Sequence, residues 1–327
     1  MIHRRVTRPQ ARSWLHSRVW LRSRVWLAAL LLSAGWMGTG WSAAQTGQNQ
    51  TAQSQTAQNQ PVQAASPTSG PAQDAATPTD ALISALRRSL VQEARGEALL
   101  ELVFPPSTTP VRRARALPRL GAVPALIRRN FVVTATPDTM AGHPATRYLL
   151  TPNSAQAARW TIWIDVRWKV PLAYQERLPG GTLARRAELL SVNHGLNRLA
   201  ARTVQTPAPG LKKALLSVLP GLSLPAGFEP LRVRVQAGAV SAGAVEVVLS
   251  DGLNVLALVV SSRAVQPASG VAVRRLGGPG LGGQSVWLVG NLPQNTLEDA
   301  LSSIQRLDPT ALASMTGTFG RPVASEE

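Results

Sequence analysis

The stretch from His143 to Val192 determines the fold and contains RYLLTP (147–152), RWTIWIDVRWKVPLAYQERL (159–178), PGG (179–181) and TLARRAELLSV (182–192). Its short apolar and aromatic runs end at Pro, Gly, Asn or Asp, which is typical of antiparallel strands joined by hairpins. Strand alternation places Trp160, Ile162 and Ile164 on one face, and Thr161, Trp163 and Asp165 on the other. The first face is more continuously apolar, so we expect it to be the core face.

The start of the chain predicts export. Residues 1–44 resemble a cleavable signal peptide, because seven arginines precede an apolar run at 25–32 and small residues follow at 42–44. An uncleaved anchor is the alternative, but the apolar run is short for a membrane span. Residues 45–79 are rich in Gln, Thr, Ala and Pro and predict a disordered linker. We therefore expect an exported protein.

Composition excludes several classes of site. The chain contains no cysteine, so disulfides, cysteine zinc sites and thiol catalysis are excluded. The formal net charge is +17, of which seven charges belong to the predicted signal peptide. The remaining basic charge fits an anionic partner or a GC-rich genome. No nucleic-acid partner is predicted, since no basic run is interleaved with aromatic residues in one domain.

The ordered part predicts two domains, at 80–193 and 224–308, joined by a connector at 194–223 and followed by a loose tail at 309–327. The first domain is expected to open with a helix capped by Asp80 and ended by Gly96. A strand at 97–104, a loop at 107–120 and the antiparallel meander described above follow. A short helix is expected within the connector at 211–219.

The second domain predicts strands separated by turns and a final helix. Asp251-Gly252 is a hairpin signal between two strongly apolar runs. Thr296 is expected to cap the helix, with Leu297, Leu301 and Ile304 on its buried face. The strands are expected at 231–236, 244–250, 254–260, 271–276 and 285–290.

Reactive side chains do not form a recognisable catalytic or metal constellation, so we predict neither a catalytic residue, a metal site nor a cofactor. His143 and His194 lie in turns and are expected to be solvent-exposed. Glu176 and Glu188 form a conceivable acid/base pair across a hairpin, but pairing with Arg177, Arg185 or Arg186 is favoured. The glycine-rich segment 277–283 lacks the lysine and the following helix of a phosphate loop.

An apolar or amphipathic ligand is expected on the face that carries Trp163. We expect Tyr174 to be a neighbour across the hairpin, and Arg147 and Arg177 to meet an anionic headgroup. The alternative is that helices cover this face as well and that Trp163 is simply buried.

Two groups of segments resemble the MucB/RseB family of envelope-stress regulators. In the first domain they are AGHPATRY (141–148), WID (163–165) and PLAY (171–174), which are also similar, more loosely, to LolA-type lipoprotein carriers. In the second domain they are LPAGF (224–228), LSDGL (249–253) and WLVGNLP (287–293), in the same order as in the family. LolA carriers lack this second domain.

The resemblance implies an α+β fold: a truncated antiparallel LolA-like half-barrel with helices, followed by a small α/β domain with an antiparallel sheet and a C-terminal helix. It implies a non-enzymatic periplasmic regulator that binds the extracytoplasmic part of a membrane-spanning anti-sigma factor. It also implies release by a lipid or a lipopolysaccharide-like amphiphile. A lipid or lipoprotein carrier of the LolA type is the alternative.

Overall fold

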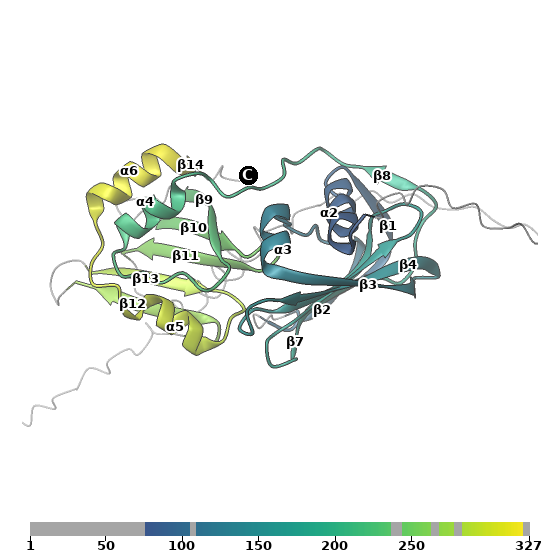
Figure 1. The fold of residues 1–327 in the computed structure, drawn as a ribbon, viewed down its shortest axis with the longest axis horizontal. Helices are drawn as coiled ribbons and strands as arrows, with labels where there is room; N and C mark the ends of the chain where they lie inside the picture. Colours follow the sequence, from purple (N-terminus) through teal and green to yellow (C-terminus); the bar gives the residue numbers. More distant parts are fainter. Residues whose placement is uncertain (1–75, 105–108, 237–243, 263–267, 278–282, 323–327) are drawn as a thin grey trace, which may run out of the picture.

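The computed structural model describes residues 76–322 except 105–108, 237–243, 263–267 and 278–282. The expected signal peptide, most of the linker and most of the glycine-rich segment lie outside the described residues. The described chain contains two sheets with separate helices (Figure 1). We call the first sheet with α2 and α3 the N-terminal lobe, and the second sheet with α4, α5 and α6 the C-terminal lobe. The α+β class, with an open antiparallel sheet followed by a smaller sheet, is confirmed.

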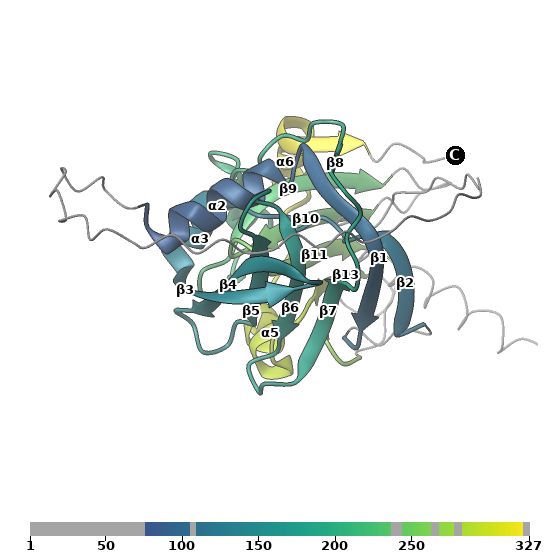
Figure 2. The same cartoon turned by 90° about the vertical axis from the view of Figure 1, so that its right-hand side faces the viewer.

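The sheet of the N-terminal lobe is antiparallel and open, with β2 and β3 at its edges (Figure 2). The order is β2-β1-β7-β6-β5-β4-β3, and β8 extends the sheet by pairing with the start of β1. The strands are β1 (Gln92–Leu102), β2 (Val111–Ala116), β3 (Phe131–Met140), β4 (His143–Pro152), β5 (Arg159–Asp165), β6 (Pro171–Arg177), β7 (Leu183–Leu189) and β8 (Leu196–Arg198).

The core of the N-terminal lobe lies between one face of this sheet and the helices α2 (Pro78–Arg88) and α3 (Pro124–Asn130). Trp160, Ile162 and Ile164 are buried there, at 0%, 0% and 2% exposure, which confirms the core face expected from alternation. Burying side chains of this size contributes about 1.5–3 kcal/mol each. The opposite sheet face, which carries Trp163, is called the outer face below.

Three local expectations for the N-terminal lobe are wrong. Thr77, not Asp80, caps α2, because the Thr77 hydroxyl accepts the Asp80 N–H at 3.2 Å. The helix ends at Arg88, and Gly96 lies within β1, where a Cβ atom would come 1.9 Å from the Ser191 carbonyl oxygen. The expected loop at 107–120 contains β2, whose arginines suit an exposed edge strand.

The C-terminal lobe contains a sheet in the order β12-β13-β11-β10-β9-β14, covered on one face by three helices. The strands are β9 (Glu229–Gln236), β10 (Ala244–Ser250), β11 (Val255–Ser261), β12 (Val271–Leu276), β13 (Gln284–Val289) and β14 (Gly320–Pro322), and the helices are α4 (Leu211–Val218), α5 (Gln294–Ser302) and α6 (Pro309–Phe319).

Most elements of the C-terminal lobe are where the sequence predicts them, and Leu297, Leu301 and Ile304 are buried as expected. Two details differ. Pro293 occupies the N-cap position of α5, so Thr296 lies inside the helix instead of capping it. The expected loose tail folds: Asp308 caps α6, and β14 pairs in parallel with β9.

The turn between β10 and β11 joins the lobes, because its tip enters the N-terminal lobe. Leu253 is 3% exposed and belongs to the core of the N-terminal lobe rather than to its own. The Gly252 carbonyl accepts the Val123 N–H at 2.9 Å, and Gly252 has φ 128°, a conformation that favours glycine. The side chain of Asn130 donates to the carbonyls of Gly227 and Asp251, both at 2.8 Å.

Candidate functional site

The outer face brings Trp163 and Arg147 together, as the sequence predicts. The two residues are direct cross-strand partners on β5 and β4. Trp163 Nε1 donates to Asp138 Oδ2 at 2.8 Å, and an Arg147 guanidinium nitrogen lies 3.8 Å from the same oxygen. The hydrogen bond from Trp163, together with the Thr139 backbone N–H, lowers the pKa of the Asp138 carboxyl. Trp163 is half-buried on the outer face. Its ring nitrogen is held in place by the hydrogen bond to Asp138.

Tyr174 is not a neighbour of Trp163, and this part of the expectation is wrong. The register pairs Tyr174 with Ile162, because Trp163 pairs with Ala173 one position along β6. Tyr174 consequently points to the core face, where its ring packs against Trp160 with centroids 6.1 Å apart. Burial raises the pKa of the Tyr174 hydroxyl, which is 2% exposed.

Arg177 lies on the outer face but at some distance from Trp163. It pairs across the sheet with Arg159, four residues from Trp163 along β5, which corresponds to roughly 13 Å. Its guanidinium donates to the Gly181 carbonyl at 2.9 Å and so braces the β6–β7 turn. Two exposed apolar side chains, Val132 at 59% and Leu149 at 42%, lie on neighbouring strands of the same face.

The acid/base alternative for Glu176 and Glu188 is excluded by the register. Glu176 pairs with Arg185 and Glu188 with Ala173, so the two carboxylates lie on opposite faces of the sheet. Each forms an ion pair with an arginine of β7, Glu176 with Arg185 and Glu188 with Arg186, as favoured from the sequence.

His143 is less exposed than expected for a turn histidine. Its Nδ1 lies 3.2 Å from Asp165 Oδ2, and its ring packs on Trp168 with centroids 5.0 Å apart. Asp165 also accepts the Arg167 backbone N–H at 2.8 Å, so it stabilises the turn after β5. Among the described residues, no group of three or more His, Asp or Glu side chains is placed to hold a metal ion.

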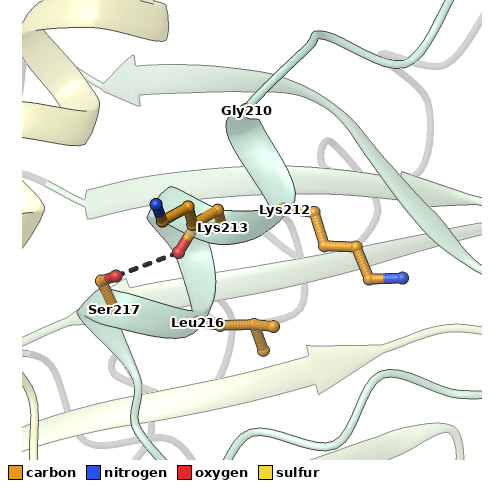
Figure 3. A pocket seen from close by; sticks show the side chains of 5 residues that line it. All are labelled: Gly210, Lys212, Lys213, Leu216 and Ser217. Atoms are coloured by element: carbon orange, nitrogen blue, oxygen red, sulfur yellow. Dashed lines mark hydrogen bonds between the residues drawn. The ribbon is translucent and has the colours of Figure 1, made fainter.

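A shallow hollow on α4 is lined by Gly210, Lys212, Lys213, Leu216 and Ser217 (Figure 3). Lys212 Nζ lies 3.2 Å from Glu229 Oε1, and Ser217 donates to the Lys213 carbonyl at 3.1 Å. The two lysine side chains point in different directions (Figure 3). Their ammonium groups therefore do not converge on one ligand.

A buried polar network at the contact between the lobes is the feature that the sequence did not reveal. Trp160 Nε1 donates to Asn254 Oδ1 at 2.8 Å, and Asn254 Nδ2 donates to Asp251 Oδ2 at 2.7 Å and to the Ala158 carbonyl at 3.3 Å. Asn291 donates to Glu176 from the other side. A polar SDGLN turn between two strongly apolar strands was the available signal.

Both carboxylates of this network are buried, Glu176 and Asp251 at 2% exposure each. Burial raises the pKa of Glu176, although Arg185 opposes the effect. Burial also raises the pKa of Asp251 from 3.8 to about 6, against hydrogen bonds from Asn254 and from the Leu253 backbone N–H. We call the set Trp160, Glu176, Arg185, Asp251, Asn254 and Asn291 the joint network.

Comparison with known proteins gives structural matches only. No family model matches the sequence, and no curated protein matches it. The Pseudomonas aeruginosa MucA/MucB complex is similar with 18% identity and a TM-score of 0.49, over 71% of this chain and 100% of that chain. MucB in complex with MucA(peri) is 19% identical with a TM-score of 0.47, over 71% and 98% of the chains. MucB alone is 18% identical with a TM-score of 0.46, over 69% and 96%.

Proposed function

We propose that this chain is a non-enzymatic, exported binding protein whose partner is the extracytoplasmic part of a membrane-spanning anti-sigma factor. One observation carries the proposal: each of the three C-terminal segments that resemble the MucB/RseB family contacts the N-terminal lobe. A resemblance produced by chance has no reason to concentrate at one interface.

Each of the three segments contributes to this contact. Segment 224–228 provides the Gly227 carbonyl that Asn130 binds at 2.8 Å. Segment 249–253 provides Asp251, Gly252 and Leu253 of the inserted turn. Segment 287–293 provides Asn291, which donates to Glu176. The two lobes therefore pack as one unit, which favours a two-domain regulator over a LolA-type carrier that lacks the second domain.

The placement of the carboxylates supports a binding role. Glu176 and Glu188 are the acid/base pair that the sequence suggested. Each forms an ion pair with an arginine, and the two carboxylates lie on opposite faces of the sheet. A hydrolase screen that detects turnover lost in a Glu176→Gln variant would contradict the non-enzymatic proposal.

The partner proposal is tested by affinity capture from envelope extracts of the source organism. The immobilised described region, residues 76–322, is expected to enrich a single-pass membrane protein encoded beside a sigma factor. An Asn130→Ala variant loses two hydrogen bonds between the lobes and tests whether binding needs both lobes in contact. It is expected to capture less of the membrane protein. Recovery of soluble cytoplasmic proteins alone contradicts the proposal, and neighbouring genes for lipoprotein transport favour the carrier alternative.

We also propose that the outer face binds the anionic amphiphile that regulates this partner. Trp163, Arg147 and the exposed Val132 and Leu149 combine apolar surface with positive charge, and Arg177 extends the basic character along β6. Tyr174 has no part in this surface because it points to the core. No helix of the described residues covers the face, since α2 and α3 pack on the opposite side.

Fluorescence titration tests the outer face. Anionic phosphatidylglycerol vesicles are expected to change the emission of the wild type, and Trp163→Phe is expected to lose most of that change. Arg147→Gln is expected to weaken binding to anionic vesicles, while Arg274→Gln on β12 of the other lobe serves as the matched control. An unchanged titration in Trp163→Phe places the binding site elsewhere.

Export through a cleavable signal peptide completes the proposal, and periplasmic location follows from it. No helix of the described region is long and apolar enough to cross a membrane. Mass spectrometry of the mature protein is expected to find an N-terminus near residue 45.

A further inference from the structure

The joint network places two buried carboxylates, Glu176 and Asp251 at 2% exposure each, at the contact between the lobes. An apolar contact of the same size has no desolvation cost, whereas each buried charge does. Glu176 and Arg185 come from the N-terminal lobe, and Asp251, Asn254 and Asn291 from the C-terminal lobe. The function proposed above uses none of these side chains to touch a ligand.

The hydrogen bonds of the network form a continuous path between the two carboxylates. Asp251 Oδ2 accepts from Asn254 Nδ2 at 2.7 Å, and Asn254 Oδ1 lies 3.4 Å from Asn291 Nδ2. The same Asn291 nitrogen donates to Glu176 Oε1, while Arg185 Nε donates to Glu176 Oε2. A change at one carboxylate therefore acts on the other lobe through two amide side chains.

The charges along this path do not balance when both carboxylates are ionised. Arg185 is the cation in contact with the network: it pairs with Glu176, and its guanidinium carbon lies 4.7 Å from the centre of the Trp160 ring. The other groups that face Glu176 and Arg185 are the neutral hydroxyl of Tyr174 and, beyond it, Arg112 of β2. Glu176 in turn faces Asp251 as a like charge. One proton brings the two carboxylates and Arg185 to neutrality.

An acceptor for this proton is present at the contact between the lobes. Asn291 Oδ1 is buried and has no hydrogen-bond partner among the described residues. A protonated Glu176 gains an O–H donor, whereas the ionised carboxylate accepts only, and the Asn291 amide already contacts Glu176 through Nδ2. We propose that Glu176 and Asp251 form a proton-operated lock between the lobes, which closes as the pH falls and loosens as it rises.

The direction follows from the pKa shifts. Burial raises the pKa of Asp251 from 3.8 to about 6, and it raises that of Glu176 as well. A carboxyl group with a higher pKa in the docked state binds its proton more tightly there, so proton binding favours docking. This contribution is complete below pH 3.8 and is lost as the pH rises through about 6. Between pH 5 and pH 7, Asp251 alone lowers the docking equilibrium constant by about 10-fold.

Amide hydrogen exchange measures the opening of the contact even when the open state is rare. The backbone N–H groups of Leu253 and Asn254 bind Asp251 Oδ1 at 3.1 and 2.9 Å, in the turn whose Leu253 is buried in the core of the N-terminal lobe, so they become accessible when the contact opens. After correction for the intrinsic pH dependence of exchange, their protection factors are expected to fall about 10-fold from pH 5 to pH 7. The amides of Val286 and Leu288, in the core of the C-terminal lobe, report global unfolding and are expected to change less.

Glu176→Gln mimics the protonated carboxyl and removes the like charge that faces Asp251. Asp251 still titrates in this variant, because burial is the main cause of its raised pKa. Protection of Leu253 at pH 7 is therefore expected to be higher than in the wild type, and the pH dependence is expected to persist but to be smaller. Glu188→Gln is the matched control, because Glu188 also pairs with an arginine of β7 but lies on the outer face. It is expected to retain the 10-fold change of the wild type.

Three results overturn the lock. The first is wild-type protection at Leu253 that is independent of pH between 5 and 7, and this measurement stands even if Glu176→Gln does not fold. The second is an equal fall in the protection factors of Leu253, Val286 and Leu288, which would show that the proton affects global unfolding instead of the contact between the lobes. The third is an unchanged pH dependence in a folded double variant, Glu176→Gln with Asp251→Asn.

Discussion

The two faces of the N-terminal sheet carry the same chemistry in opposite surroundings. On the core face, Trp160 Nε1 donates to Asn254 at 2.8 Å, beside the Glu176–Arg185 ion pair. On the outer face, Trp163 Nε1 donates to Asp138 at 2.8 Å, beside Arg147. Burial raises the pKa values of Glu176 and Asp251, whereas the hydrogen bond from Trp163 lowers that of Asp138. The surroundings, rather than the residue types, therefore decide which cluster links the lobes.

The largest expected difference between the faces is in stability. Trp160 is 0% exposed, and Trp160→Ala removes its packing together with its bond to Asn254. We expect a loss of about 3–5 kcal/mol in the free energy of unfolding. Trp163→Ala, on the half-buried outer face, is expected to cost roughly 1–2 kcal/mol. Urea denaturation of both variants measures the difference, and equal losses would show that the outer face is as tightly packed as the core.

The ion pairs on the two faces provide the second comparison. Glu176→Ala leaves Arg185 and Asn291 without their shared acceptor at a buried site. We expect a loss of about 2–4 kcal/mol. Glu188→Ala removes a similar pair at the surface and is expected to cost less than about 1 kcal/mol. A cost for Glu188→Ala that approaches that of Glu176→Ala would contradict the assigned difference in surroundings.

The sequence predicts the outer-face pair but not the joint network, and the reason is physical. Alternation fixes the face of each residue within one strand, so Trp160, Ile162 and Trp163 are assigned correctly. The neighbour of Tyr174 depends on the register between β5 and β6, which pairs it with Ile162. A shift of one residue in this register would move Tyr174 to the opposite face of the sheet. The bond between Trp160 and Asn254 joins residues 94 positions apart, and no local pattern encodes that contact.

Errors at the edges of the fold have local causes. The arginines of 111–116 suggest a loop because they supply little apolar alternation, yet an edge strand tolerates charge on its free side. Gly96 reads as a helix terminator, but its missing Cβ serves the close approach of Ser191. In the tail, Asp308 and Pro309 are typical residues for the start of a helix. The helix is difficult to predict because its sequence is only weakly amphipathic.

The pH dependence of stability distinguishes the buried carboxylate of Asp251 from carboxylates at the surface. The pKa of Asp251 is raised to about 6, so the wild type is expected to lose about 1 kcal/mol from this group between pH 5 and pH 7. Asp251→Asn cannot titrate, and its stability is expected to change less over this range. Asp299→Asn, at an exposed position of α5, is the control and is expected to follow the wild type. Parallel curves for the wild type and Asp251→Asn would remove Asp251 from the explanation.

The smallest expected effect has the opposite sign and belongs to the outer face. Because hydrogen bonds lower the pKa of Asp138, its contribution to stability is present above the ordinary pKa of an aspartate and is lost as the pH falls below it. Asp138→Asn should therefore be less stable than the wild type at pH 7, and the difference should shrink as the pH falls below the ordinary pKa of an aspartate. Urea unfolding at several pH values measures this convergence, with Trp163 emission as a local probe. A constant difference at all pH values would mean that Asp138 acts through the shape of its hydrogen bond with Trp163 rather than through its charge, and the two faces would then differ in packing alone.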